Sequence, residues 1–206
     1  KPGTIARRVE RRLAIHQIKT LADYILYLQK NPAEINTLFK NLVIGVTSFF
    51  RDPEAYDVLA QQVLPKLLSA KEPYTMIRLW VAGCSTGEEP YTLAMILLEK
   101  MYHLSGWKLE IIANDISENV LQRARNGVYS GITLRNVKPD ILNRYFDKTD
   151  ETYRVKPEVK ALVKFSHMNL NEARRLSMMT KIDVIFFRNV MIYFSDEVKK
   201  NIMRGF

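Results

Sequence analysis

The sequence has little of the chemistry that disulfides and metal sites require. Its 206 residues include one cysteine, Cys84, and three widely separated histidines, His16, His103 and His167. A single cysteine excludes an internal disulfide and fits a reducing compartment. Structural zinc sites draw on clustered cysteines and histidines, so this spacing predicts no metal site. We expect packing or surface roles for the histidines and no nucleophilic role for Cys84.

Long apolar segments are also missing. No run approaches the roughly 18 uncharged apolar residues that a membrane-spanning helix requires. The first residues, KPGTIARRVERR, are basic but precede no apolar segment, so they do not resemble a secretory signal. These absences predict a cytoplasmic protein. A hydrophobic content of 47% with eight glycines and eight prolines is typical of a globular chain with one good core.

Positive charge is present in excess and is unevenly distributed. The net charge is +9, and residues 1–30 hold seven lysines and arginines against two acids, a net charge of +5. A basic helix of this kind binds nucleic acid, an anionic membrane or an acidic protein, or is only a solvated surface. The basic residues in this segment are Lys1, Arg7, Arg8, Arg11, Arg12, Lys19 and Lys30.

Helical patterns dominate the first part of the chain. Apolar residues recur at helical spacing over residues 5–17. Thr20 is a typical N-cap for a second helix, and Pro32 occupies the favoured first turn of a third. We therefore predict a small all-helical domain over residues 1–50, and a fourth helix from Pro53 to Leu68.

Strands alternate with helices from Ile77 onward. Apolar runs at 77–83, 107–115 and 181–190 predict strands. The segments at 91–104 and 117–127 predict helices. This alternation is typical of an α/β fold with a parallel, doubly wound sheet, here over residues 51–206. The run at 181–190 is apolar enough for the middle of that sheet. Residues 150–166 break the pattern, and we expect a small β-subdomain with two short strands around Lys156.

A glycine turn joins the first predicted strand to the next helix in the stretch WVAGCSTGEEPY. Gly83 and Gly87 allow the backbone to approach a ligand, but Glu88 and Glu89 occupy the helix start, where a phosphate would otherwise bind. A phosphate about 4 Å from a carboxylate would meet a repulsion of about 4 kcal/mol at a surface-like dielectric constant. The spacing also differs from G-x-G-x-x-G and from the P-loop. The turn therefore favours a phosphate-free, cationic nucleoside, S-adenosylmethionine, with its carboxylate on the backbone N–H groups and its positive end near Glu88.

Asp115 ends the next predicted strand, 28 residues after Gly87. An acid at this point of a Rossmann-type unit binds ribose hydroxyls. The alternative is that Glu88 and Glu89 only complement the helix dipole and that Asp115 only caps the next turn.

Five segments resemble, in order, the chemotaxis receptor methyltransferases of the CheR family, which are S-adenosylmethionine-dependent protein-glutamate O-methyltransferases. The likeness runs from about Arg7 to the C-terminus, and the segment around VTSFFRD is most similar to members fused to other signalling domains. The segments are VTSFFRD (46–52), CSTGEEPYTLA (84–94), ANDIS with ARNGVYS (113–130), NL (169–170) and RNVMIYFS (188–195).

The resemblance implies a Rossmann-like catalytic domain, a helical N-terminal domain that docks on acidic receptor helices, and a β-subdomain that in some members tethers a receptor tail. It also implies a monomer that uses S-adenosylmethionine, releases S-adenosylhomocysteine and binds no nucleic acid. Tyr193 matches a tyrosine beside the transferring methyl group, and Arg51 a catalytic and cofactor-pocket arginine. With Gly83 and Gly87, the implied cofactor residues are Thr47, Arg51, Glu88, Asp115, Asn169, Leu170, Arg188 and Asn189.

Each of the two catalytic assignments has a plainer alternative. Tyr193 could only pack a strand end, and Arg51 could be an exposed arginine paired with Asp52 or Glu54. The chain also departs from the family at three points. Gly45 and Ser117 replace an asparagine and an acid that many members have, and the sequence stops at Phe206, before the final strands of a complete family sheet. We therefore expect a truncated catalytic domain.

Two other functions stay open at this point. One is a methyltransferase for nucleic acids or small molecules, but the sequence has no N-P-P-Y-type motif and no catalytic Pro-Cys pair. The other is a non-catalytic module that binds S-adenosylmethionine or S-adenosylhomocysteine, which the glycine at position 45 and the early end of the chain would allow.

Overall fold

The computed structural model describes residues 2–43, 47–72, 75–101, 106–172 and 180–204. The chain divides into two compact units, Lys1–Val46 and Thr47–Phe206. We describe each unit by itself. Gly45 and His103 lie outside the described residues.

The first unit contains three helices, α1 (Pro2–Ile15), α2 (Leu21–Lys30) and α3 (Pro32–Val43). Thr20 caps α2 as predicted, because its hydroxyl oxygen accepts a hydrogen bond from the Asp23 backbone N–H at 3.1 Å. Pro32 is the first residue of α3, where its missing N–H costs no helical hydrogen bond. The sequence therefore predicted all three helices and the starts of α2 and α3, whereas α1 begins at Pro2, before the predicted range of 5–17.

A buried carboxylate connects these three helices. Glu34 of α3 is only 6% exposed. It accepts hydrogen bonds from the Arg12 Nε of α1 at 2.7 Å and from the Tyr24 hydroxyl of α2 at 2.6 Å, and the His16 Nε2 lies 3.0 Å away. The Arg12 hydrogen bond lowers the pKa of Glu34 to about 2, and burial together with the Glu34 hydrogen bond raises the pKa of Tyr24 to about 12. This buried polar cluster links all three helices of the small unit.

The second unit opens with one long helical segment, α4 (Pro53–Val58), a π-helical turn η1 (Leu59–Val63) and α5 (Leu64–Ala70). The sequence predicted a single helix over most of this range. The wide turn lies directly before Pro65, which has no N–H for the regular helical ladder.

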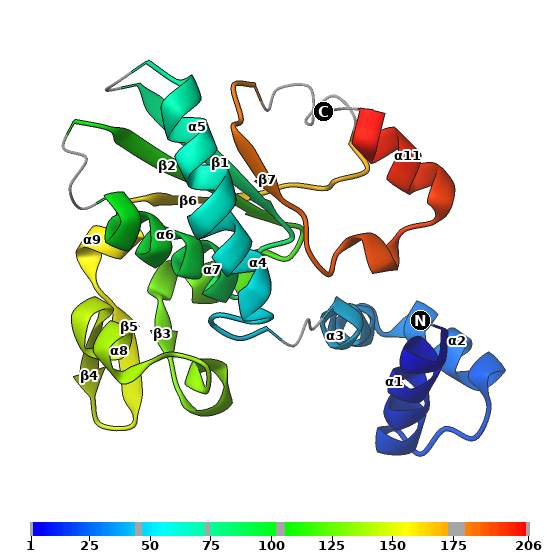
Figure 1. The fold of residues 1–206 in the computed structure, drawn as a ribbon. Helices are drawn as coiled ribbons and strands as arrows, with labels where there is room; N and C mark the ends of the chain where they lie inside the picture. Colours follow the sequence, from blue (N-terminus) through cyan, green and yellow to red (C-terminus); the bar gives the residue numbers. More distant parts are fainter. Residues whose placement is uncertain (1, 44–46, 73–74, 102–105, 173–179, 205–206) are drawn as a thin grey trace. The chain divides into compact units, whose positions relative to one another are not determined.

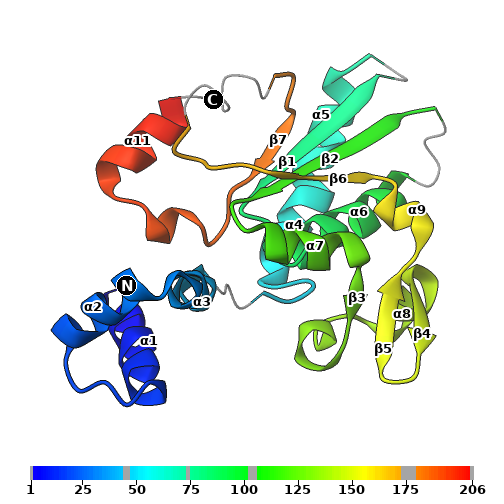
Figure 2. The ribbon, with the colours of Figure 1, turned by 180° about the vertical axis from the view of Figure 1, so that it is seen from behind.

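Four parallel strands form the central sheet, β1 (Met76–Ala82), β2 (Lys108–Asp115), β6 (Val163–His167) and β7 (Val184–Phe186), in the order β6-β2-β1-β7. Alternate residues of β1 face two separate apolar clusters. Leu79 and Val81 pack in the larger one, and Trp80 and Ala82 pack in the smaller one with Ile202. Figures 1 and 2 show α4, α5, α6 (Glu88–Met101) and α7 (Glu118–Asn126) on one face of the sheet. Ile202 belongs to α11 (Asp196–Arg204), which therefore packs on the opposite face.

Two details of the sequence prediction were wrong. Residues 163–166, expected in the β-subdomain, belong to β6, which pairs in parallel with β2 from Ile111 to Asp115 in the central sheet. β7 lies at the edge of the described sheet, not in its middle, and only Val184–Phe186 of the long apolar run is a strand. An apolar run does not reveal which neighbours a strand has, because a helix-covered edge strand is as apolar as a central one.

The β-subdomain is a separate antiparallel sheet in the order β3-β5-β4, built from β3 (Val128–Tyr129), β4 (Phe146–Thr149) and β5 (Thr152–Val155). The short helices η2 (Gly131–Leu134), α8 (Pro139–Tyr145) and α9 (Pro157–Lys160) accompany it. Phe146 and Val155 anchor it to the larger apolar cluster. Its strands therefore begin earlier in the sequence than residues 150–166.

We predict that Glu34→Gln loosens the helical unit, because the substitution removes the negative charge that holds Arg12. The expected cost is about 2 kcal/mol of local stability. The pKa of Glu34 is lower in the folded unit than in the unfolded chain, so this stabilisation is present above about pH 4.5 and is lost as the pH falls towards 2. Hydrogen exchange of residues 2–43 in the full chain measures it, with the exposed Glu10→Gln as the matched control. Equal protection in the two variants at pH 7 would contradict the prediction.

Candidate functional site

The candidate site lies at the edge of the central sheet where its parallel strands end. β2 and β6 lie on one side of β1, and β7 lies on the other side, so the strand order reverses at β1. Ligands of open α/β sheets bind outside the carboxyl ends of the strands at such a point. Four of the predicted site segments follow these ends: Gly83 after β1, Asp115 at the end of β2, Asn169 after β6 and Arg188 after β7. The topology thus brings to one edge residues that are up to 105 positions apart in the sequence.

Asp115 organises the first three of these segments. One carboxylate oxygen accepts the Ser85 N–H at 2.9 Å, and the other accepts the Ser117 N–H at 2.9 Å. The backbone carbonyl of Asp115 accepts the Met168 N–H at 3.0 Å, which fixes the end of β6. Each carboxylate oxygen has two lone-pair sites, so one on each oxygen stays available to a ligand. The predicted alternative, a cap for the next turn, is therefore also present, and it does not exclude a second role.

The two glycines of the turn are required by their packing as well as by their conformation. Gly83 has a φ of +72° and Gly87 a φ of +96°. A Cβ on Gly83 would lie 2.4 Å from a Val190 methyl group, and one on Gly87 would lie 2.9 Å from the Cβ of Ala124 and from the Tyr129 hydroxyl. The space beside these glycines is thus occupied by the protein itself. Because Gly83 has no side chain, the loop after β7 can lie close to the glycine turn.

Glu88 begins α6 and is almost fully buried, with 1% of its surface exposed. Its side chain accepts a hydrogen bond from the Thr86 hydroxyl at 2.7 Å. Burial raises the pKa of Glu88, since the charged form loses its hydration. A cation bound beside Glu88 would favour the ionised form, whereas an anion would oppose it.

Glu89 makes a different contact from the one that the sequence suggested. Its carboxylate accepts a hydrogen bond from the Arg188 Nη1 at 3.0 Å. The Nη2 of the same guanidinium donates to Asp52 Oδ2 at 2.8 Å and to the backbone carbonyl of Arg51 at 3.0 Å. The guanidinium carbon also lies 5.2 Å from the centre of the Tyr56 ring, at the distance of a cation–π contact. Glu89 is therefore half of an ion pair, and Arg188 joins the loop after β7 to α6 and to residues 51–52.

Backbone strain is concentrated in the same loops. Phe50, Asp52, Ser85 and Asn189 have positive φ angles of 50°, 55°, 50° and 56° although none is glycine. Such conformations cost about 1–3 kcal/mol each and persist where surrounding contacts hold them. Asp52 is held by the Arg188 bridge, and Ser85 by its hydrogen bond to Asp115. Strain of this kind is typical of functional loops.

The remaining predicted residues are more loosely connected to this arrangement. Thr47 is half-buried, and Leu170 packs in the smaller apolar cluster near Trp80. The Asn169 side-chain oxygen accepts the Asn171 N–H at 3.0 Å. The Arg51 Nε lies 3.8 Å from the Asp52 Oδ2, which is the pairing that the plainer alternative predicted. Asn189 is exposed, and Tyr193 is 65% exposed on the short helix η3 (Met191–Tyr193), so it does not pack a strand end.

Sequence reasoning missed the partners of Arg188. Neither Asp52 nor Tyr56 was a candidate, and Glu89 was interpreted only as a charge near the ligand. Asp52 and Tyr56 are 136 and 132 positions from Arg188, so only the folded chain reveals the bridge. One available signal was the sign of the charges, since FFRD and GEEP supply the acids Asp52 and Glu89, and Arg188 opens RNVMIYFS.

Within the described residues, no group of three or more histidines, cysteines, aspartates and glutamates is arranged to hold a metal ion. No helix in the described part of the chain has the length and apolarity needed to cross a membrane.

Comparison with protein families gives two matches that together cover almost the whole chain. Residues 45–206 match the SAM binding domain of CheR methyltransferase, and residues 1–43 match the all-alpha domain of CheR methyltransferase. The border between these matches falls next to the border between the two compact units.

Curated relatives agree with these matches. The chain is 36% identical to a chemotaxis protein methyltransferase of Borreliella burgdorferi over 98% of its length and 73% of the relative's. It is 32% identical to chemotaxis protein methyltransferase 2 of Vibrio cholerae, over 98% of this chain and 71% of the relative. It is also 33% identical, over 99% of its length, to an uncharacterized 104.1 kDa protein of Rhodobacter capsulatus, of which it spans only 21%.

Proposed function

The chain belongs to the CheR methyltransferase family, and we propose that it transfers the methyl group of S-adenosylmethionine to glutamate side chains on the cytoplasmic part of chemotaxis receptors. The observation that carries this proposal is the meeting of acids and a glycine turn at the strand ends, without a phosphate-binding motif. The family match names S-adenosylmethionine as the cofactor. The receptor, the glutamates and the cytoplasmic location belong to the proposal.

Two acids at the strand ends fit this cofactor. Asp115 keeps one lone-pair site on each carboxylate oxygen, which suits the two hydroxyls of a ribose. Buried Glu88 suits a positive group. The backbone N–H groups of residues 83, 84, 85 and 87 already donate to Asn114, Asp115 and Cys84, so the expectation that this backbone binds the cofactor carboxylate is not met in this structure. Glu89 is already neutralised by Arg188, so Glu88 is the acid that we expect to discriminate against phosphates.

The reaction requires alignment more than acid–base chemistry. Bound S-adenosylmethionine supplies an electrophilic methyl group, and a glutamate side chain is already ionised at neutral pH. We propose that Tyr193, whose side chain is mostly exposed, borders the entering carboxylate and orients it. Arg51 is 39% exposed beside the Arg188 bridge, and we propose that it attracts this negative substrate. Apolar walls that exclude water would then raise the rate, because both reacting charges disappear.

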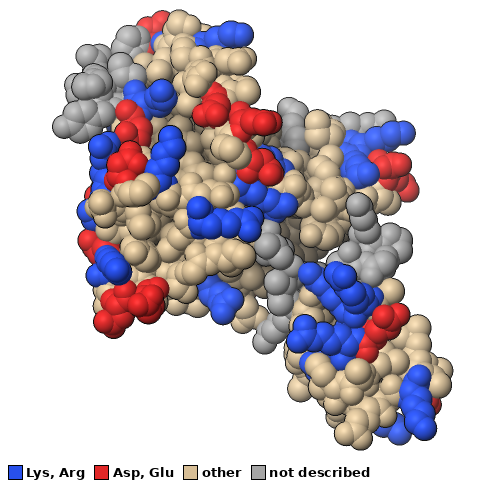
Figure 3. Space-filling view, turned by 60° about the horizontal axis from the view of Figure 1, so that its bottom comes forward, with Lys and Arg blue, Asp and Glu red and all other residues tan. Residues whose placement is uncertain are grey.

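The helical unit carries our proposal for receptor docking, and its structure changes which arginines take part. Arg12 binds Glu34 inside the unit, and Arg8 donates to the Asn41 carbonyl at 2.6 Å, so both stabilise the unit itself. Arg7 and Arg11 are exposed one helical turn apart. Figure 3 shows lysine and arginine side chains gathered on the helical unit. α2 adds exposed Leu21 and Ile25, at 57% and 50% exposure, so the unit offers both charge and apolar surface to an acidic amphipathic helix.

The small sheet supports a second, weaker contact. β4 lies at one edge of the β3-β5-β4 sheet, and its residues 147–149 are exposed. An edge strand pairs with an extended peptide through backbone hydrogen bonds. We propose this edge for a receptor tail, where the receptor has one.

We predict that Asp115→Ala reduces the affinity for S-adenosylhomocysteine at least about tenfold, since two ribose hydrogen bonds to a charged group are lost. Calorimetric titration of the full chain measures the dissociation constant. Asp147→Ala, which removes an exposed acid of β4, is the matched control and should bind like the parent. Parent-like affinity in Asp115→Ala, with hydrogen exchange showing an intact sheet, would exclude the ribose assignment.

We also predict that reversing Arg7 and Arg11 together to glutamate lowers kcat/KM for a chemoreceptor fragment by about tenfold at low salt, and flattens its dependence on ionic strength. The affinity for S-adenosylhomocysteine should not change. Lys66→Glu with Lys108→Glu gives the same change in net charge in the second unit, and should leave the salt dependence intact. If the two double variants behave alike, docking does not depend on α1.

A further inference from the structure

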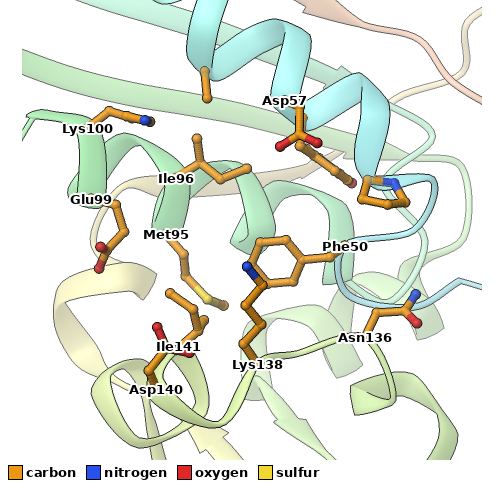
Figure 4. A pocket seen from close by; sticks show the side chains of 13 residues that line it. Phe50, Asp57, Met95, Ile96, Glu99, Lys100, Asn136, Lys138, Asp140 and Ile141 are labelled. Atoms are coloured by element: carbon orange, nitrogen blue, oxygen red, sulfur yellow. The ribbon is translucent and has the colours of Figure 1, made fainter.

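A cavity of about 330 Å³ lies between α4, α6 and the chain that leads into α8. Its volume is in the range of sites for small molecules. It contains none of the predicted cofactor residues, although Phe50 precedes Arg51. Its apolar walls come from Phe50, Met95, Ile96 and Ile141, and Figure 4 shows these side chains converging on one space.

Exposed charged groups of both signs stand around this apolar space. Among the described residues, Asp57 and Asp140 form no ion pair, and neither do Lys100 and Lys138; by contrast, Glu99 is held by Arg144 and Tyr145. In Figure 4 the Asp57 carboxylate extends from α4 towards the cavity, and Lys138 extends from the opposite wall towards Phe50. Surface charges usually find counterions of the protein or of solvent, but here opposite charges face one apolar pocket from two sides.

We propose that this cavity is a second ligand site that binds a free amino acid with an apolar side chain. The ammonium group of the ligand faces Asp57, its carboxylate faces Lys138, and its side chain packs between Phe50, Met95 and Ile141. A zwitterion with an apolar body matches both charges and the apolar walls at once. This site contains none of the residues assigned to the cofactor and does not depend on the reaction proposed above.

The test is a titration of the full chain with L-phenylalanine, observed through labelled methyl groups of Met95 and Ile141. We expect saturable shifts of these methyl signals with a dissociation constant of about 1 mM, which is usual for so small a ligand. N-acetyl-L-phenylalanine lacks the ammonium group, and L-phenylalaninamide lacks the carboxylate, so each should bind at least about tenfold more weakly.

Two variants locate the site. Lys138→Ala should weaken binding of L-phenylalanine about tenfold or more, whereas Lys108→Ala, an exposed lysine outside the cavity, should have no effect. Asp115→Ala should bind the amino acid like the parent, which separates this result from any failure of the cofactor assignment. The proposal is wrong if the methyl signals do not shift, if the two capped analogues bind as well as L-phenylalanine, or if Lys138→Ala binds like the parent.

Discussion

The guanidinium of Arg188 holds together the loops that form the candidate site. It joins the loop after β7 to Glu89 at the start of α6 and to residues 51–52, and its face lies against Tyr56. Arginine suits this position because its planar group donates in several fixed directions at once. Removal of Arg188 would leave the charges of Glu89 and Asp52 without this partner. These contacts therefore hold the loops in one arrangement. Asp52, one of the residues with a positive φ angle, is held by its contact with Arg188.

This bridge changes the electrostatic meaning of the GEEP motif. The adjacent glutamates differ in role, because Glu89 is neutralised by Arg188 while Glu88 is buried beside Thr86. Burial raises the pKa of both carboxyl groups, and the positive charge of Arg188 counteracts this at Glu89. Glu88 and the absence of phosphate-binding motifs in the sequence therefore disfavour a phosphate ligand. These groups still fit a sulfonium nucleoside.

The sequence predicted the helices of the first unit, the α/β alternation and the residues at the strand ends, because caps, periodicity and turns are local signals. It misassigned residues 163–166 and the position of β7, because strand neighbours depend on contacts between distant segments. The same limit hid the Arg188 bridge and the internal roles of Arg8 and Arg12. Charge counts treat every arginine alike, whereas Glu34 and the Asn41 carbonyl bind two of the four arginines of α1.

The central claim is that the residues at the strand ends direct methyl transfer to receptor glutamates. The most direct measurement is transfer of a labelled methyl group from S-adenosylmethionine to cytoplasmic fragments of chemoreceptors, followed by release of the label in mild base. Our account predicts a base-labile ester that disappears when the receptor glutamates are replaced by alanine. Tight cofactor binding with no transfer to any receptor fragment, or a label that survives base, would contradict it.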